Sequence, residues 1–511
     1  MSFAAILGRI DETPFWLRGL LAGLLCLAVQ LPFLTVVPQI TVDEPWYANT
    51  AYNLAQGQGL VNTNTGWRGG DEFFLYTVAL AGVFQLTDAT LWAARFFSVI
   101  LGTLATLGFV RLGTRLELRG STMALGVLLL VSGNVFYMVF RRVRPEVVVV
   151  LCAIAALYFL FGGLQQRHRR LFFAAGLFSG AACLAHPNAA LLVVLLTVVV
   201  LRNVFRQRDA RPLPYFLAGV GLCMAALLVH ITQIREVPVT VFFEELFFSS
   251  ERVALPDSSF LAGVVDNAVL FFNDYTLGIK RAYILIFEVG IMVVGLLCGR
   301  RQRALRLVSG VGLGYLVLAL LFLRPFHRIG FVVVIVFSLM SFLLLVDRLE
   351  VRSALRRCLL VAGILYLGNN VAGDAYVLHR GRAWNDYSEL SRRIERDLPD
   401  DATVICNMSF WFPLRDKTTY THSTRWRFTP YENLAELLAS GDATHAVISN
   451  YILDGISPTT GEPTVYPIRH RRFYETLEPY LVQNAKLVTS IATTNYGEVQ
   501  VWRIPAAVRK R

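Results

Sequence analysis

Charged residues are scarce in this chain of 511 residues. Only 16% of the residues are Asp, Glu, Lys or Arg, whereas 55% are hydrophobic and the mean hydropathy is +0.52. Soluble globular domains carry about 25% charged residues. The composition therefore excludes an ordinary soluble protein and is typical of a chain that crosses a membrane many times.

Lysine is nearly absent, because the chain has it only at positions 280, 417, 486 and 510. The net charge of +12 and the pI near 9.5 come almost entirely from arginine. A basic pI can indicate binding to nucleic acid, but these arginines cluster between apolar segments, so membrane topology explains them better. The preference for arginine over lysine also hints at a GC-rich bacterial genome.

Cysteine is almost confined to apolar segments. Of the seven cysteines only Cys406 lies elsewhere, which excludes a disulfide framework within a soluble domain. The apolar run from Phe15 to Val37 is too long for a cleavable signal and has no clear small-residue cleavage site, so we interpret it as the first transmembrane helix. We find no internal repeat or low-complexity linker.

Long apolar runs are abundant. An apolar helix of about 20 residues crosses the hydrocarbon core, and by this measure the chain has eleven spans: 15–37, 91–110, 121–140, 147–164, 171–186, 188–204, 213–234, 282–299, 307–323, 329–347 and 358–374. The apolar stretch 73–86 is shorter, and we expect it to form a helix that lies on the membrane surface.

The distribution of arginine gives the expected orientation. With a cytoplasmic N-terminus, each of five cytoplasmic loops carries at least three arginines: 111–120, 165–170, 202–211, 300–306 and 348–357. This agrees with the positive-inside rule, which would fail if 73–86 were a full span. The loops 39–90 and 235–280 and everything after Tyr376 then lie outside. We expect a multi-pass protein of the bacterial inner membrane.

The tail has a different character, so we divide the chain into a transmembrane domain, 1–374, and an extracytoplasmic domain, 375–511. Helical periodicity appears in DYSELSRRIERDL and PYENLAELL. Short strands are predicted for ATVICN, HAVISN, KLVTSIA and EVQVWRI. The fold class is thus a polytopic α-helical membrane protein with a small α/β domain outside the membrane.

Two short outer loops break the positive-inside rule. RRVRPE contains Arg141, Arg142 and Arg144, and RPFHR contains Arg324 and Arg328. Arginines on the disfavoured side need another reason, and a bound anion at the outer face is the simplest. The alternative is that these side chains extend to lipid headgroups.

Acidic residues gather at the same face. Asp43 and Glu44 follow the first span, and Asp71-Glu72 precedes the surface helix. A carboxylate there can take a proton from an attacking hydroxyl group while arginines hold a phosphate. The alternative is that each pair only caps a helix.

Three further outer-face residues have similar alternatives. Glu146 could merely neutralise the neighbouring arginines. His186, in LAHPN, fits a turn between two spans, and His327 could be an ordinary surface histidine.

The order of these segments resembles that of a known family. The outer VDEPWYANTAYNLAQGQG, the later RRVRPE and LAHPNAALL, and the spans between them resemble the GT-C membrane glycosyltransferases, in the branch of the protein mannosyltransferases and aminoarabinose transferases. The resemblance covers roughly 15–330, and DEPWYA is its most specific part. It implies an enzyme that transfers a sugar from a polyprenyl phosphate to an acceptor outside the cytoplasm, which could be a glycolipid, a glycan or a protein.

The resemblance also implies roles for single residues. Asp43 is the candidate general base, with Glu44 the next candidate, and Glu146 is the acid of the second outer loop. RPFHR, with Arg324, His327 and Arg328, resembles the segment that holds the donor phosphate. Arg142 and Arg144 are further candidates for that phosphate.

Other positions are candidates for the donor pocket. Arg252, in FFEELFFSSER, is one of them. Asp71, Glu72 and His186 are the others, and they stand where the aminoarabinose transferases carry lysines, so the sugar is left open. The resemblance implies that a monophosphate donor needs no metal, and we favour this donor because two arginine clusters already supply positive charge. A diphosphate donor would call for a divalent metal on Asp43 and Glu146.

Two other classes of function remain. A transporter would use the arginines as an anion pathway, and Glu288, inside a span, favours it. Most ionisable residues nevertheless lie at the ends of spans, and no repeat is visible. A sensor led by the tail domain would leave the Asp43 and Glu146 pattern without a purpose.

Overall fold

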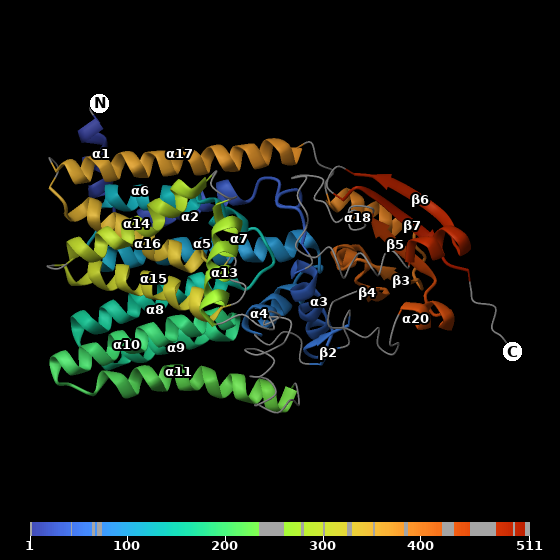
Figure 1. Ribbon diagram of the computed structural model, residues 1–511, viewed down its shortest axis with the longest axis horizontal. Helices are drawn as coiled ribbons and strands as arrows, with labels where there is room; N and C mark the ends of the chain where they lie inside the picture. The colour runs from blue at the N-terminus through green and yellow to red at the C-terminus, as the bar shows by residue number, and fades with distance from the viewer. Residues whose placement is uncertain are drawn as a thin grey trace.

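The computed structural model consists of a long helical bundle and a smaller α/β domain at one end of it (Figure 1). The structure describes residues 3–41, 43–63, 67–68, 74–234, 260–276, 281–299, 302–323, 330–350, 353–382, 387–421, 434–449, 477–493 and 496–505. The predicted fold class is confirmed.

Most of the spans predicted in the N-terminal half of the bundle coincide with a single helix. Its helices are α1 (Phe3–Glu12), α2 (Phe15–Gln30), α5 (Leu91–Arg115), α6 (Gly120–Val131), α7 (Asn134–Val139), α8 (Glu146–Gln166), α9 (Arg169–Ala185), α10 (Ala190–Gln207) and α11 (Pro212–Val229). A short 3-10 turn, η1 (Pro187–Ala189), precedes α10, and a π-helical turn, η2 (His230–Ile234), follows α11.

The C-terminal half of the bundle contains α13 (Phe260–Thr276), α14 (Ala282–Cys298), α15 (Arg303–Phe322), α16 (Val332–Arg348) and α17 (Ala354–Arg382). Helix α16 lies at the centre, where Val332–Val346 is buried without interruption. A helix that is apolar on all sides can be surrounded by lipid or by other helices, and the burial of α16 shows that other helices surround it. Within the described residues, six helices are long and apolar enough to cross a membrane, so the count of eleven spans stays a prediction.

Two predicted spans differ from the structure. The helix expected over 15–37 ends at Gln30, and the chain continues through turns in which Phe33 has a φ of 57°. The span expected over 121–140 is two helices, α6 and α7, with Gly133 as the N-cap of the second. Proline at position 32 and glycine at position 133 favour such breaks.

A layer of short elements lies between the bundle and the α/β domain (Figure 1). It contains α3 (Asp43–Ala55), the paired strands β1 (Val61–Asn62) and β2 (Trp67–Arg68), and α4 (Leu75–Phe84). Helix α4 has 10 residues, about half of the length that a span needs. Its length does not fit a full span, and its position on the membrane surface stays a prediction.

The α/β domain is built on one mixed sheet with the order β4-β3-β5-β7-β6. Strands β3 (Thr403–Cys406), β4 (Thr418–Thr421) and β5 (His445–Ser449) are parallel, while β6 (Lys486–Ala492) and β7 (Glu498–Arg503) pair antiparallel. Its helical elements are α18 (Tyr387–Arg396), η5 (Met408–Phe410), α19 (Trp411–Leu414) and α20 (Leu434–Ser440). The four predicted strands are present, and β4 was not predicted.

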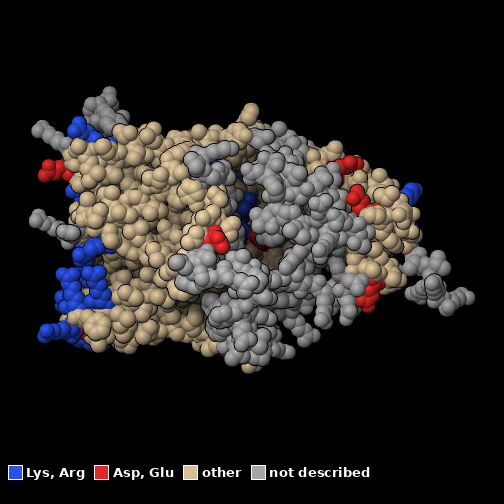
Figure 2. Space-filling model, in the orientation of Figure 1, with Lys and Arg blue, Asp and Glu red and all other residues tan. Residues whose placement is uncertain are grey.

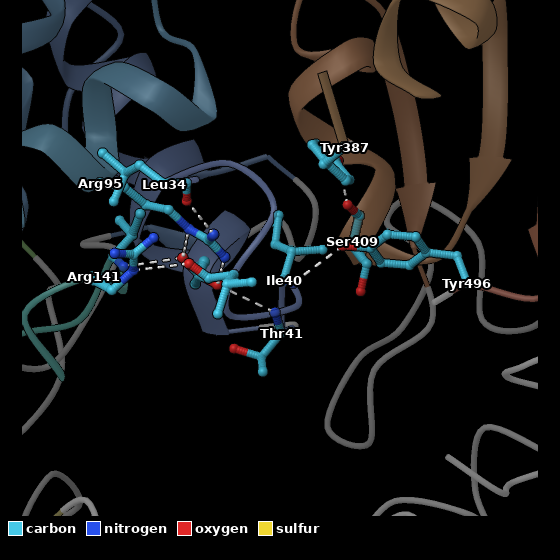
Figure 3. A network of polar contacts seen from close by, with 11 residues as sticks. Leu34, Ile40, Thr41, Arg95, Arg141, Tyr387, Ser409 and Tyr496 are labelled. Carbon is cyan, nitrogen blue, oxygen red and sulfur yellow. Dashed lines mark hydrogen bonds and ion pairs between the residues drawn. The ribbon is translucent and has the colours of Figure 1, made fainter. Parts of the chain in front are cut away.

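The α/β domain contacts the layer directly. The hydroxyl group of Tyr52 donates to Asp416 at 2.5 Å, and the ring of Tyr52 packs edge-on against Trp411. The backbone N–H of Ile40 donates to the Tyr496 hydroxyl group at 3.2 Å (Figure 3). These contacts hold the domain over the segment that carries Asp43 and Glu44.

Candidate active site

Asp43 and Glu44 form the first turn of α3, followed by Pro45. Acidic side chains are favoured there because the helix dipole is positive at its N-terminus, and proline fits because its missing N–H would have no partner within the helix. Adjacent residues of a helix point about 100° apart. The two carboxylates therefore enter different surroundings.

Glu44 is completely buried and bound to Arg95 of α5. Arg95 donates from Nε and Nη2 to the two carboxylate oxygens, at 2.9 and 2.7 Å, and from Nη1 to the carbonyl oxygen of Leu34 at 2.7 Å (Figure 3). The backbone N–H of Val143 also donates to Glu44, at 3.1 Å. Glu44 thus fastens α3 to α5 and to the loop before α8.

Arg141 is buried as well and binds the end of α2. Its guanidinium group donates to the carbonyl oxygens of Gln30, Pro32 and Val37 at 2.5, 2.6 and 2.9 Å, and it stacks over Tyr137. The last carbonyl groups of a helix have no partner within the helix. Arg141 supplies it, so an arginine on the predicted outer side has a structural purpose.

Arg144 joins the remaining two carboxylates. Its Nη1 donates to Asp43 Oδ2 at 2.5 Å, and its Nη2 and Nε donate to Glu146 at 2.8 and 3.1 Å. Burial lowers the pKa of Arg144, but Glu146 and Asp43 outweigh this and raise the pKa well above its ordinary value. The guanidinium group therefore stays charged between them.

The three carboxylates differ in exposure, and this difference separates their roles. The side chain of Asp43 is 38% exposed, that of Glu146 is 7% exposed and that of Glu44 is 0% exposed. Arg144 contacts only one oxygen of Asp43, whereas each glutamate is held through both oxygens. Asp43 is thus the carboxylate of this group that a bound molecule can reach.

Tyr76 and His186 lie close to these carboxylates. The hydroxyl group of Tyr76, in α4, is 2.8 Å from Ser98 Oγ, and Tyr76 is fully buried. His186 is the C-cap of α9, and its ring accepts a hydrogen bond from the backbone N–H of Asn188. It lies close enough to Glu146 for an electrostatic interaction. Arg142 is buried in the same loop.

Several predicted site residues lie outside the described residues. These are Asp71, Glu72, Arg252, Arg324, His327 and Arg328. The structure brings together Asp43, Glu44, Arg144, Glu146 and His186 from three separate stretches of sequence. Within the described part of the chain, no group of three or more His, Cys, Asp or Glu side chains could hold a metal ion.

Sequence reasoning missed Arg95 and Tyr76. Arg95 could have been found from the sequence, because it lies near the predicted outer end of a span, where the positive-inside rule disfavours arginine. Nothing in the sequence distinguishes Tyr76, since an aromatic residue in an apolar helix is ordinary.

Comparison with known proteins shows what this chain is similar to. Residues 73–231 match the family model of dolichyl-phosphate-mannose-protein mannosyltransferase. The fold is similar to that of ArnT from Cupriavidus metallidurans bound to undecaprenyl phosphate, with a TM-score of 0.62 and 13% identity over 96% of this chain and 99% of that chain. The apo state of that protein gives a TM-score of 0.59 and 14% identity, again over 96% of this chain and 99% of that chain.

A larger protein shares the fold. The arabinofuranosyltransferase AftD from Mycobacteria matches 96% of this chain, with a TM-score of 0.51 and 14% identity, but only 40% of that chain is covered. No curated protein matches this sequence. The resemblance predicted from the sequence is confirmed as a similarity: the solved structures share the fold, and the mannosyltransferase family model matches residues 73–231.

Proposed function

We propose that the protein transfers a sugar from a polyprenyl phosphate to an acceptor outside the cytoplasm, with Asp43 as the general base. The observation that carries the proposal is the geometry of Asp43, which Arg144 holds through one oxygen while the side chain stays 38% exposed. Support for the donor comes from the similar fold of ArnT, whose structure contains undecaprenyl phosphate.

In this mechanism the acceptor hydroxyl group binds beside Asp43 and gives up its proton as it attacks the anomeric carbon. Arg144 fixes the direction of the carboxylate, since Glu146 holds the other side of the guanidinium group. A positioned base contributes roughly 10²–10⁴-fold to the rate.

The leaving group is a lipid phosphate, which needs positive charge more than it needs a proton. Arg324, Arg328 and His327 are proposed to supply that charge, together with Arg142. Arg144 was a candidate for the same task, but its ion pairs give it to Asp43 and Glu146.

A monophosphate donor and a mechanism without metal fit this arrangement better than the alternative. A divalent ion on Asp43 and Glu146 would have to displace Arg144 from between them. The sugar is left open, and the acceptor is a glycolipid, a glycan or a protein. We propose the bacterial inner membrane as the location, with the N-terminus cytoplasmic and the α/β domain outside.

The transporter alternative depended on Glu288. Its carboxylate accepts a hydrogen bond from the Tyr366 hydroxyl group at 2.6 Å, and its backbone carbonyl oxygen accepts one from Ser338 at 2.9 Å. These bonds join α14 to α17 and α16. A structural purpose for Glu288 removes the main observation that favoured transport.

The test compares cells with and without the gene by mass spectrometry of extracytoplasmic glycans and glycolipids. We expect one sugar modification to disappear with the gene and to return with wild-type protein, but not with Asp43→Asn at the same protein level. Full restoration by Asp43→Asn would remove Asp43 from the role of base. Identical glycans in the two strains would count against the transfer reaction.

A further inference from the structure

A second charged site lies at the opposite end of the bundle from Asp43. Helices α10 and α15 pack side by side there, and basic side chains gather over that end of the molecule (Figure 2). A cavity of about 240 Å³ opens between the two helices. Arg202, Arg206, Arg303 and Arg306 line it, together with aliphatic residues.

These four arginines carry uncompensated charge. Within the described residues, no Asp or Glu forms an ion pair with any of them, and neither residue type lines the cavity. Arg303 donates from Nη2 to Asn203 Oδ1 at 2.7 Å, and Asn203 is buried, so one guanidinium group is fixed at the wall. Four like charges around one cavity repel each other, and a bound anion would relieve the repulsion.

The rest of the wall is apolar and continues onto the outer surface of α10. Leu195, Val198 and Val199 line the cavity. Val198 is 55% exposed, and Val194, one turn further from the arginines, is 52% exposed. A molecule that fits this surface has an anionic head and an apolar chain.

Membrane topology alone does not explain this arrangement. The positive-inside rule requires arginines in the loops on one side, and exposed residues such as Arg170 and Arg357 satisfy it without lining the cavity. Guanidinium groups that converge on one cavity are the arrangement that binds phosphate oxygens.

We propose that this cavity binds the phosphate headgroup of an anionic phospholipid from the leaflet at the arginine-rich end, with an acyl chain along α10. Basic pockets between transmembrane helices bind such headgroups. The site is separate from the proposed transfer site and does not depend on it.

The test measures retention of phosphatidylglycerol by the purified full-length protein in native mass spectrometry. Phosphatidylcholine serves as the zwitterionic comparison, and inorganic phosphate serves as the competitor. We expect one phosphatidylglycerol to be retained in preference to phosphatidylcholine. The Arg202→Gln/Arg306→Gln variant should bind it at least about tenfold more weakly, because each guanidinium–phosphate bond contributes roughly that factor.

The matched control is Arg170→Gln/Arg357→Gln, which removes the same charge at the same end but outside the cavity. It should bind like wild type, as should Asp43→Asn. If the first double variant does not fold, Arg202→Lys/Arg306→Lys keeps the charge and should show intermediate binding because the planar fork is lost.

Four outcomes would overturn the proposal: unchanged retention in the cavity variants, an equal loss in the control variant, equal retention of phosphatidylcholine, or displacement of the lipid by millimolar inorganic phosphate. The last result would assign the cavity to a free phosphate ion.

Discussion

The neighbouring residues Asp43 and Glu44 have different roles, although they are adjacent in the sequence. Glu44 and Arg95 form an ion pair in which both side chains are 0% exposed, and this pair joins two helices. Asp43 is the exposed one and faces Arg144. Glu44 cannot replace Asp43 as the base, because Glu44 is held in a buried ion pair.

Replacing Glu44 should therefore affect stability. Glu44→Gln leaves the Arg95 charge buried without its partner, and such losses cost about 3–5 kcal/mol. We expect a clearly lower unfolding midpoint for the purified protein in a denaturant titration. Asp209→Asn, which breaks an exposed pair with Arg211, should leave that midpoint unchanged. A wild-type midpoint for Glu44→Gln would show that the ion pair does not stabilise the fold.

Arg144 offers a second test, which separates positioning from phosphate binding. Lysine at this position can reach one carboxylate but cannot hold Asp43 and Glu146 together, because it lacks the planar fork. If Arg144 positions the base, Arg144→Lys should lower kcat roughly tenfold with little change in the KM for the donor. A raised KM with normal kcat would assign Arg144 to the donor instead.

At the scale of elements, α9 and α11 pack unusually closely. A Cβ atom on Gly176 would lie 2.0 Å from the carbonyl oxygen of Phe216, and one on Gly219 would lie 2.3 Å from that of Phe173. Small residues at such positions let transmembrane helices approach each other. Helix α9 ends at Ala185, directly before His186, so this contact also helps to position His186 near Glu146.

We therefore expect Gly176→Ala to destabilise the protein by about 1–3 kcal/mol, the usual cost of overpacking. The control is Gly221→Ala on α11, where a Cβ atom would meet nothing within 4 Å. Both changes raise helix propensity similarly. In detergent, the midpoint of thermal unfolding should be lower for Gly176→Ala than for Gly221→Ala. Equal midpoints would argue against the close contact.

The elements also show where sequence patterns were sufficient. Alternating or continuous apolar runs predicted β3, β5, β6 and β7, but Thr418–Thr421 has no apolar run and forms β4 through pairing with β3. The break between α6 and α7 was missed although Ser132-Gly133-Asn134 interrupts the apolar stretch there. Strand pairing partners, in contrast, depend on neighbours that are distant in sequence.

For the whole molecule, the main prediction is that the α/β domain lies outside the cytoplasm. In a background without the exposed Cys298 and Cys358, a cysteine at the exposed position Asn484 should react with an impermeant reagent in intact cells or spheroplasts. A cysteine at Arg170, at the arginine-rich end, should react only after the membrane is opened. The reverse pattern would invert the orientation.

The sequence by itself determined that the chain is a membrane protein, which loops carry arginine and which class of enzyme it resembles. These follow from composition and short motifs, because hydrophobicity and the positive-inside rule act on each segment locally. Only the tertiary structure decided which carboxylate is accessible. Arg95 lies 51 residues from Glu44 and Arg144 lies 101 residues from Asp43, so the two ion pairs exist only when the helices pack.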